Sequence, residues 1–82
     1  MTEEQIWRRL TGVFHDVFGD DDIVIGPETA ARDVEGWDSL ANIQLLVAIE
    51  AAFKGVKFNT GEVASMRNVG EMVAVIKQRA SG

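Results

Sequence analysis

The chain has 82 residues, the size of one small domain, so we expect a single domain spanning residues 1–82. A composition of 46% hydrophobic and 26% charged residues is typical of a globular protein. A chain this short has little room for an enclosed substrate cavity beside its core. The absence of cysteine excludes disulfides, thiolate metal sites and cysteine nucleophiles.

The net charge of −5 is unevenly distributed. Residues 16–38 hold eight acidic residues and one basic residue, a charge of −7, which leaves +2 for the rest. This acidic block argues against a nucleic-acid partner and favours basic protein surfaces, although a solvated loop has the same composition. No secretory signal and no apolar run of about 18 residues is present, so we expect a cytoplasmic monomer that does not enter a membrane.

The first predicted helix ends at about residue 18. Thr2 and Gln5 have the spacing of a capping box at its start. One helical stripe of apolar residues follows: Ile6, Leu10, Val13, Phe14, Val17 and Phe18. Trp7 lies beside this stripe and is expected to cover the edge of the core, and Gly19 ends the helix.

Residues 19–37 form a long connection. The apolar triplet 23–25 could be a short strand, but the chain offers no second strand to pair with it. We therefore expect a loop, with a helical turn after Pro27. Four apolar side chains are candidates to hold this loop on the core: Ile23 or Ile25 near its start, and Val34 and Trp37 at its end.

A second helix is predicted over residues 38–53, with Asp38 as a good N-cap residue. Its apolar residues form two adjacent stripes, which is more than one core-facing side requires. Four of them are expected in the core: Leu45, Leu46, Ile49 and Phe53, with Leu46 at the border of the two stripes. Three are expected to be exposed: Leu40, Ile43 and Val47. The alternative is a central helix that is buried all round.

After a glycine stop at Lys54-Gly55, Val56 and Phe58 are expected to enter the core. A brief helix from Thr60 to Met66 is predicted, with Asn59 and Glu62 as its capping pair. Asn68 and Glu71 repeat this pair before a last helix that runs out at residues 78–80. That helix is expected to bury Val69, Met72, Val73 and Ile76. Three longer helices and one short helix around one core predict an all-α bundle.

An enzyme is one alternative, because Ser39, Asp38 and His15 are the residue types of a catalytic triad. Adjacent helical residues project at different angles, so Asp38 cannot readily orient a histidine against Ser39. Gly-x-Ser-x-Gly is also absent. We therefore expect no catalytic residue and no enzyme. One histidine without cysteine cannot build a zinc site, and residues 20–22 lack the spacing of a calcium loop, so we expect no metal site.

The stretch Gly36-Trp37-Asp38-Ser39-Leu40-Ala-Asn-Ile-Gln-Leu-Leu-Val-Ala-Ile-Glu resembles the modification site of acyl carrier proteins. The resemblance covers nearly the whole chain and implies an acyl-carrier-like four-helix bundle with three longer helices, a short third helix and a long first loop. It implies that Ser39 is esterified by 4′-phosphopantetheine, with Asp38 supporting the helix start. A helix N-terminus suits a phosphodiester. It also implies that the protein carries acyl intermediates as thioesters.

The resemblance further implies which surface meets partner proteins. The residues concerned are Leu40, Ile43, Gln44 and Val47. The partners are a phosphopantetheinyl transferase and acyl-loading or acyl-processing enzymes, namely an acyltransferase, ketosynthase or ligase. Gly36-Trp37 before the motif resembles free-standing carriers of polyketide or related secondary pathways. An aminoacyl or peptidyl carrier and an unmodified helical interaction module are the alternatives.

Overall fold

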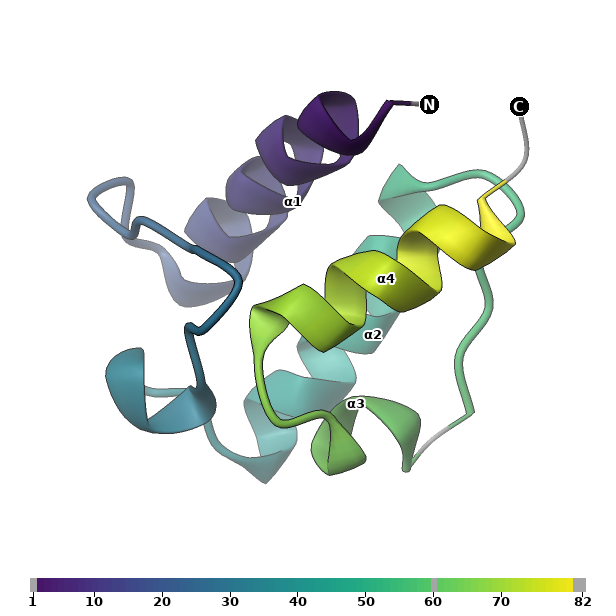
Figure 1. Cartoon of the computed structure of the whole chain (residues 1–82). Helices are drawn as coiled ribbons and strands as arrows, with labels where there is room; N and C mark the ends of the chain where they lie inside the picture. The colour runs from purple at the N-terminus through teal and green to yellow at the C-terminus, as the bar shows by residue number, and fades with distance from the viewer. Residues whose placement is uncertain (1, 60, 81–82) are drawn as a thin grey trace.

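The computed structural model describes residues 2–59 and 61–80. Within these residues the chain has no strand and forms five helical elements: α1 (Glu3–Phe18), the 3₁₀ helix η1 (Ala31–Asp33), α2 (Ser39–Ala52), α3 (Glu62–Ser65) and α4 (Val69–Arg79). In Figure 1, α4 crosses in front of α2, α1 lies beside them and α3 closes the lower end. α1 makes its most extensive contacts with α2. The predicted all-α bundle is confirmed.

The core is built from one face of each longer helix and from the segment that follows α2. The largest fully buried side chains are Phe14, Phe53, Ile6, Leu10, Leu45, Ile49, Met72, Ile76, Val56 and Val69. Phe58 is also buried, and Trp7 lies at the edge of this cluster, as the sequence predicts. Burial of these apolar surfaces is the main favourable term that holds the helices together.

Polar side chains fix where the longer helices begin. The Thr2 hydroxyl accepts a hydrogen bond from the Gln5 backbone N–H at 3.2 Å, and the Gln5 side chain accepts one from the Thr2 backbone N–H at 2.9 Å. Asp38 caps α2, and Asn68 caps α4 through the Glu71 amide at 2.9 Å. All three caps are predicted from the sequence, because each pairs a side chain with an amide three residues later.

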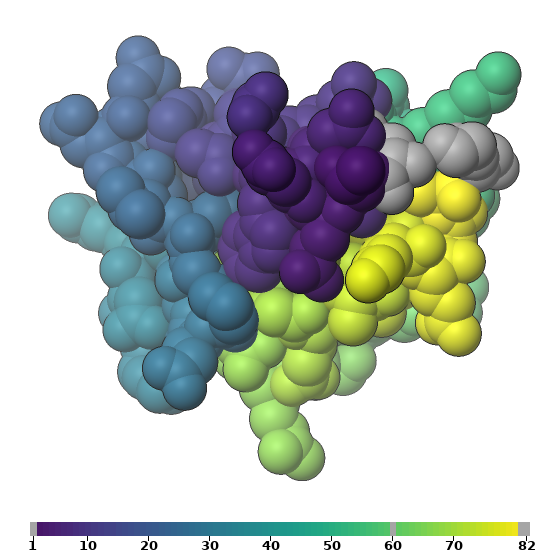
Figure 2. Space-filling model, turned by 45° about the horizontal axis from the view of Figure 1, so that its top comes forward, coloured from purple at the N-terminus to yellow at the C-terminus, as the bar shows by residue number. Residues whose placement is uncertain are grey.

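The connection between α1 and α2 is a loop, and it forms one side of the molecule (blue to teal, at the left of Figure 2). Ile25 is buried and Ile23 is half-buried, so both proposed anchors reach the core. Val34 is buried as well. The helical turn expected after Pro27 is η1, which begins four residues further on.

The predicted bounds of the third helix are wrong. α3 is a single turn, Glu62–Ser65, and its N-cap residue Gly61 makes no side-chain capping bond. Asn59 does not cap it through its side chain: its backbone N–H donates to the Glu62 carboxylate at 2.8 Å, and its carbonyl accepts the Glu62 amide. Asn59 therefore bonds to Glu62 through its backbone groups. Thr60, the predicted first residue of this helix, lies outside the described residues.

The start of α4 is docked on the first loop. The Val69 amide donates to the Thr29 carbonyl at 2.8 Å, and the Gly70 amide donates to the Pro27 carbonyl at 3.0 Å. These two bonds satisfy amides that the helix leaves unpaired in its first turn. The approach is so close that a Cβ added at Gly70 would lie 2.7 Å from the Pro27 carbonyl oxygen.

We expect Gly70→Ala to lower the free energy of unfolding by about 1–3 kcal/mol, because the added methyl group would collide with backbone and not with a flexible side chain. Gly12→Ala is the matched control in α1, where an added Cβ meets nothing within 4 Å. It should raise stability by about 0.5–1 kcal/mol, since alanine costs less entropy in a helix. Urea unfolding measures both, and an unchanged midpoint for Gly70→Ala would contradict the close approach.

α3 is joined to α4 by an ion pair between Glu62 and Arg79, with 2.7 Å between Oε2 and Nη2. Arg79 also donates to the Lys57 carbonyl at 2.8 Å. The Arg79 guanidinium, followed by the Asn59 amide, lowers the pKa of the Glu62 carboxyl from 4.5 to about 2. A carboxyl with a lowered pKa in the folded state stabilises the fold above pH 4.5, and this contribution is lost as the pH falls towards 2.

We expect Arg79→Gln to raise the pKa of Glu62 towards 4.5, because the charged donor is removed. NMR titration of the Glu62 carboxyl measures this directly. Glu62→Gln should lose less stability between pH 4.5 and 2 than the wild type does, since the amide does not titrate. A Glu62 pKa that stays near its wild-type value in Arg79→Gln would show that the ion pair is not its cause.

Candidate functional site

Ser39 is the first residue of α2 and is exposed. The Asp38 carboxylate accepts the Ala41 amide at 2.9 Å, and the Asp38 carbonyl accepts the Asn42 amide at 3.0 Å. Asp38 therefore caps the helix, as predicted, and Ser39 is not needed for this purpose. An α-helix leaves the amides of its first turn without intrahelical partners, so the positive end of the helix dipole lies beside the Ser39 hydroxyl.

The Ser39 hydroxyl differs from the other described serine and threonine hydroxyls in its hydrogen bonding. Thr2 and Thr29 accept backbone amides through their hydroxyls, and the hydroxyls of Thr11 and Ser65 donate to backbone carbonyls. Among the hydroxyl-bearing residues of 2–59 and 61–80, Ser39 alone makes no side-chain hydrogen bond with another described residue. An exposed hydroxyl without a structural role is available for modification.

Trp37 fixes this helix start against the rest of the bundle. Its ring meets Phe14 edge to face at 5.3 Å between centroids and lies 6.2 Å from Phe18. Its indole N–H donates to the side-chain oxygen of Asn42, one turn inside α2. Gly36 has a φ of +88°, which lets the chain turn sharply before the tryptophan. The sequence predicts the anchoring role of Trp37, but not Asn42 as its partner.

α2 has a buried and an exposed face. Leu45 and Ile49 are fully buried, whereas Leu40, Ile43 and Val47 are 63%, 52% and 59% exposed. Leu46 is half-buried at the border, as predicted. The alternative of a helix buried all round is therefore wrong.

Leu40, Ile43, Gln44 and Val47 are exposed at spacings of three and four, so they lie along one side of the helix. We call these four residues the α2 patch. Leu40 directly follows Ser39 and Ile43 lies about one turn after it, so the α2 patch begins beside the serine. The structure thus brings together all the side chains that the sequence assigns to the site, while the sequence did not identify Ala41 as a buried residue of the opposite face.

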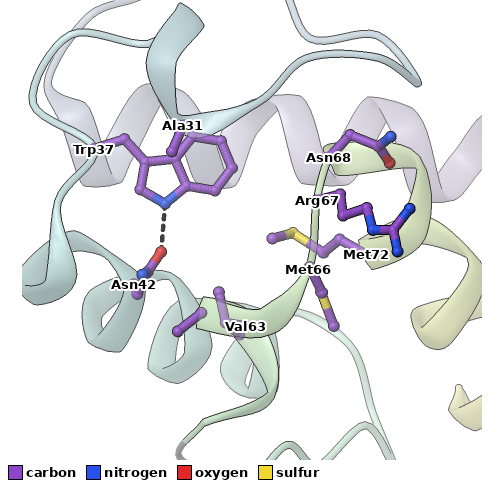
Figure 3. A pocket seen from close by; sticks show the side chains of 9 residues that line it. Ala31, Trp37, Asn42, Val63, Met66, Arg67, Asn68 and Met72 are labelled. Atoms are coloured by element: carbon purple, nitrogen blue, oxygen red, sulfur yellow. Dashed lines mark hydrogen bonds between the residues drawn. The ribbon is translucent and has the colours of Figure 1, made fainter.

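A small cavity lies between the start of α2, α3 and the turn before α4 (Figure 3). Trp37 and Asn42 form one side, and Met66 and Met72 lie across from them. Its volume is about 40 Å³. This is room for a few water molecules, well below the roughly 300 Å³ of a small-molecule pocket. The cavity is too small to enclose a reaction.

Other residues considered from the sequence have structural roles. The His15 Nε2 lies 2.8 Å from the Ile23 carbonyl oxygen and holds the first loop to α1. In the part of the chain that the structure describes, no three acidic or histidine side chains are placed to hold a metal ion. Over the same residues, no helix has the length and apolar character needed to cross a membrane.

Comparison with known proteins places these features in a family. Residues 8–76 match the family described as the phosphopantetheine attachment site. The chain is 31% identical over 77 residues to a meromycolate extension acyl carrier protein of Mycolicibacterium smegmatis, covering 94% of this chain and 77% of that protein. The chain belongs to the acyl carrier protein family.

Two further relatives agree with this assignment. A meromycolate extension acyl carrier protein of Mycobacterium tuberculosis is 31% identical over 78 residues, which cover 95% of this chain and 67% of that protein. The solution NMR structure of a holo acyl carrier protein from Geobacter metallireducens superposes with a TM-score of 0.79 at 38% identity, covering 89% of this chain and 83% of that one. The acyl-carrier-like fold predicted from the sequence is confirmed.

Acyl carrier domains carry 4′-phosphopantetheine, are generally not catalytic, and act with phosphopantetheinyl transferases and acyl-handling enzymes. The residues around Ser39 fit this group. The hydroxyl is exposed and without a partner among the described residues, and the unpaired amides of the helix start favour a phosphodiester beside it. Asp38 stabilises the helix start through the Ala41 amide.

Proposed function

We propose that Ser39 is the residue to which 4′-phosphopantetheine is attached. The observation that carries this proposal is the exposed hydroxyl at the N-terminus of α2, which makes no hydrogen bond with another described residue. The four other described hydroxyls all make hydrogen bonds within the chain. Within the transferase, the Ser39 oxygen attacks the pyrophosphate of coenzyme A. A phosphodiester bond to the serine forms, and the nucleotide part of coenzyme A leaves.

The attached group supplies a thiol that forms thioesters with acyl chains. The protein's own residues bind and present this group. α2 holds Ser39 at the surface, and Trp37 and Asp38 fix the helix start from which it projects. We further propose that the chain is not itself an enzyme, since the candidate acid–base groups of His15 and Asp38 are engaged by the backbone and the reaction takes place in partner active sites.

We propose that the protein is a cytoplasmic, monomeric carrier that delivers acyl intermediates to loading and processing enzymes. The relatives from Mycolicibacterium smegmatis and Mycobacterium tuberculosis are named as carriers of meromycolate extension, while the sequence around Trp37 resembles carriers of polyketide pathways. Both settings use the same thioester chemistry. An intact mass of the loaded protein from its native host distinguishes a fatty acyl, a polyketide and an aminoacyl group.

We propose that the α2 patch is where these partner enzymes dock. Three large apolar side chains are exposed on one side of one helix, starting at the residue that follows Ser39. Apolar surface in contact with water is costly, and its burial in a complex recovers that free energy. Between Ser39 and Ala52 the helix carries one charged residue, Glu50, whose carboxylate accepts the Phe58 amide at 2.9 Å. Docking on this surface is therefore mainly apolar.

Incubation of the apo protein with coenzyme A, magnesium and a broad-specificity transferase is expected to add one phosphopantetheine to the wild type. Ser39→Ala should gain nothing. Ser65→Ala is the matched control, because Ser65 is also exposed on a helix but donates to the Glu62 carbonyl, and it should be modified like the wild type. Intact-mass measurement reads all three. A mass increase in Ser39→Ala, or none in the wild type, would refute the assignment.

Ile43→Ala and Val47→Ala are expected to unfold within about 0.5 kcal/mol of the wild type, since both side chains are exposed. Ile49→Ala and Phe53→Ala should lose about 2–5 kcal/mol, because they leave cavities in the core. The kcat/KM of transferase loading should nevertheless fall about fivefold or more for Ile43→Ala and Val47→Ala, the effect of losing about 1 kcal/mol of interface contact. Loading at the wild-type rate would argue against docking through this patch.

A further inference from the structure

The bond between Trp37 and Asn42 closes a segment of chain around the candidate attachment residue (Figure 3). An indole N–H can only donate, so its partner is the side-chain oxygen of Asn42 and not the NH2 group. The backbone N–H of Asn42 donates in turn to the Asp38 carbonyl at 3.0 Å. Residues 37–42 are therefore joined at both ends, and Ser39 lies inside this closed segment.

The direction in which Ser39 projects depends on the first turn of α2. Its side chain is exposed and makes no hydrogen bond with another described residue, so nothing holds the hydroxyl directly. The Asp38 cap shapes the turn locally. The Trp37 ring is packed on Phe14 of α1, and its bond to Asn42 therefore joins this turn to another helix.

The small cavity lies directly beside this bond, since Trp37 and Asn42 both line it. A side chain that borders an empty space loses packing contacts on that side, so the hydrogen bond matters more for the direction of the indole ring. The cavity of about 40 Å³ also has room for water. In a variant without the Asn42 oxygen, a water molecule would satisfy the indole N–H. The loss would then cost little stability, but Trp37 would no longer be joined to α2.

We propose that Asn42 is a positioning residue for the loading reaction: through Trp37 it holds the first turn of α2, and with it the Ser39 oxygen, in the direction of attack. This inference rests on the attachment of phosphopantetheine to Ser39 proposed above. In that step the Ser39 oxygen bonds to the phosphorus that carries the pantetheine group, adenosine 3′,5′-bisphosphate leaves, and the serine proton passes to a base of the transferase. A nucleophile displaced by a fraction of an ångström reacts more slowly.

Positioning and docking have different kinetic effects. Asn42 is not part of the α2 patch, which is the surface proposed to bind the transferase. Loss of a docking contact raises KM, whereas loss of positioning acts after binding and lowers kcat. Asn42 and Ile43 are adjacent in the chain, so the two effects can be compared at neighbouring positions of one helix.

Two variants of Asn42 test the proposal in the loading reaction with coenzyme A, magnesium and a broad-specificity transferase. Asn42→Leu has a similar size and no acceptor, so kcat should fall about fivefold or more while KM stays within about twofold. Its Tm should stay within about 8 °C of the wild type, as expected for one lost hydrogen bond. Asn42→Asp keeps an acceptor oxygen and loses the NH2 group, so its kcat should stay within about twofold of the wild type.

The other partner of the bond supplies a second pair of variants. Trp37→Phe keeps an aromatic ring against Phe14 and removes the indole N–H, so it should lower kcat as Asn42→Leu does. The double variant should lose no more than either single variant, because both remove the same bond. Trp7→Phe is the matched control at the edge of the core and should load like the wild type.

Hydrogen exchange of the Trp37 indole N–H reports the bond without the loading reaction, and it should be faster in Asn42→Leu than in the wild type. A wild-type kcat in Asn42→Leu, an equal loss in Asn42→Asp, or losses that multiply in the double variant would overturn the positioning role. A much lower Tm in Asn42→Leu would overturn it too, because the role would then be structural. A wild type that is not loaded at all would instead refute attachment at Ser39.

Discussion

The start of α2 is the constraint on which the rest of the structure depends. Trp37 joins the end of the first loop to Phe14 of α1 by an edge-to-face contact and to α2 through Asn42. The next residue, Asp38, caps the helix. Because aromatic contact and cap are adjacent in the chain, the position and the first turn of α2 are fixed together. The candidate attachment residue, Ser39, follows immediately, so it projects from a helix start that both contacts hold in place.

The apolar residues of α2 lie on two faces of the helix, one buried and one exposed. The face containing Leu45 and Ile49 fills the core, and the α2 patch stays in water. In a domain of 82 residues, few other segments are available to cover one helix on all sides. A helix with apolar residues on all sides must therefore leave some of them exposed. The same property that fills the core with one face of α2 thereby leaves the α2 patch exposed beside Ser39, and this is the surface proposed for partner docking.

The sequence predicts those features that depend on local spacing. The caps at Thr2, Asp38 and Asn68 and the two faces of α2 follow from residues three or four apart, and the structure confirms them. Two contacts without a periodic signal were not predicted: the docking of Gly70 on the distant Pro27, and the bond from Trp37 to Asn42 five residues later. The bounds of α3 were wrong for a related reason. Asn and Glu three residues apart suggest a side-chain cap, but here the Glu62 amide bonds to the Asn59 carbonyl, and the Glu62 carboxylate joins the Asn59 amide to Arg79 of α4.

Ser39 lies at the boundary between two electrostatic environments. The segment 16–38 before it carries a charge of −7, whereas α2 after it has one acidic residue, Glu50, which is held by a backbone amide. Charge acts over about 8–10 Å at physiological ionic strength, while apolar contact acts only at touching distance. The acidic connection therefore acts on charged groups at a distance, whereas the docking proposed for the α2 patch acts only at contact, beside the serine. On this view salt concentration affects mainly the association rate, and the side chains of the α2 patch affect mainly the dissociation rate.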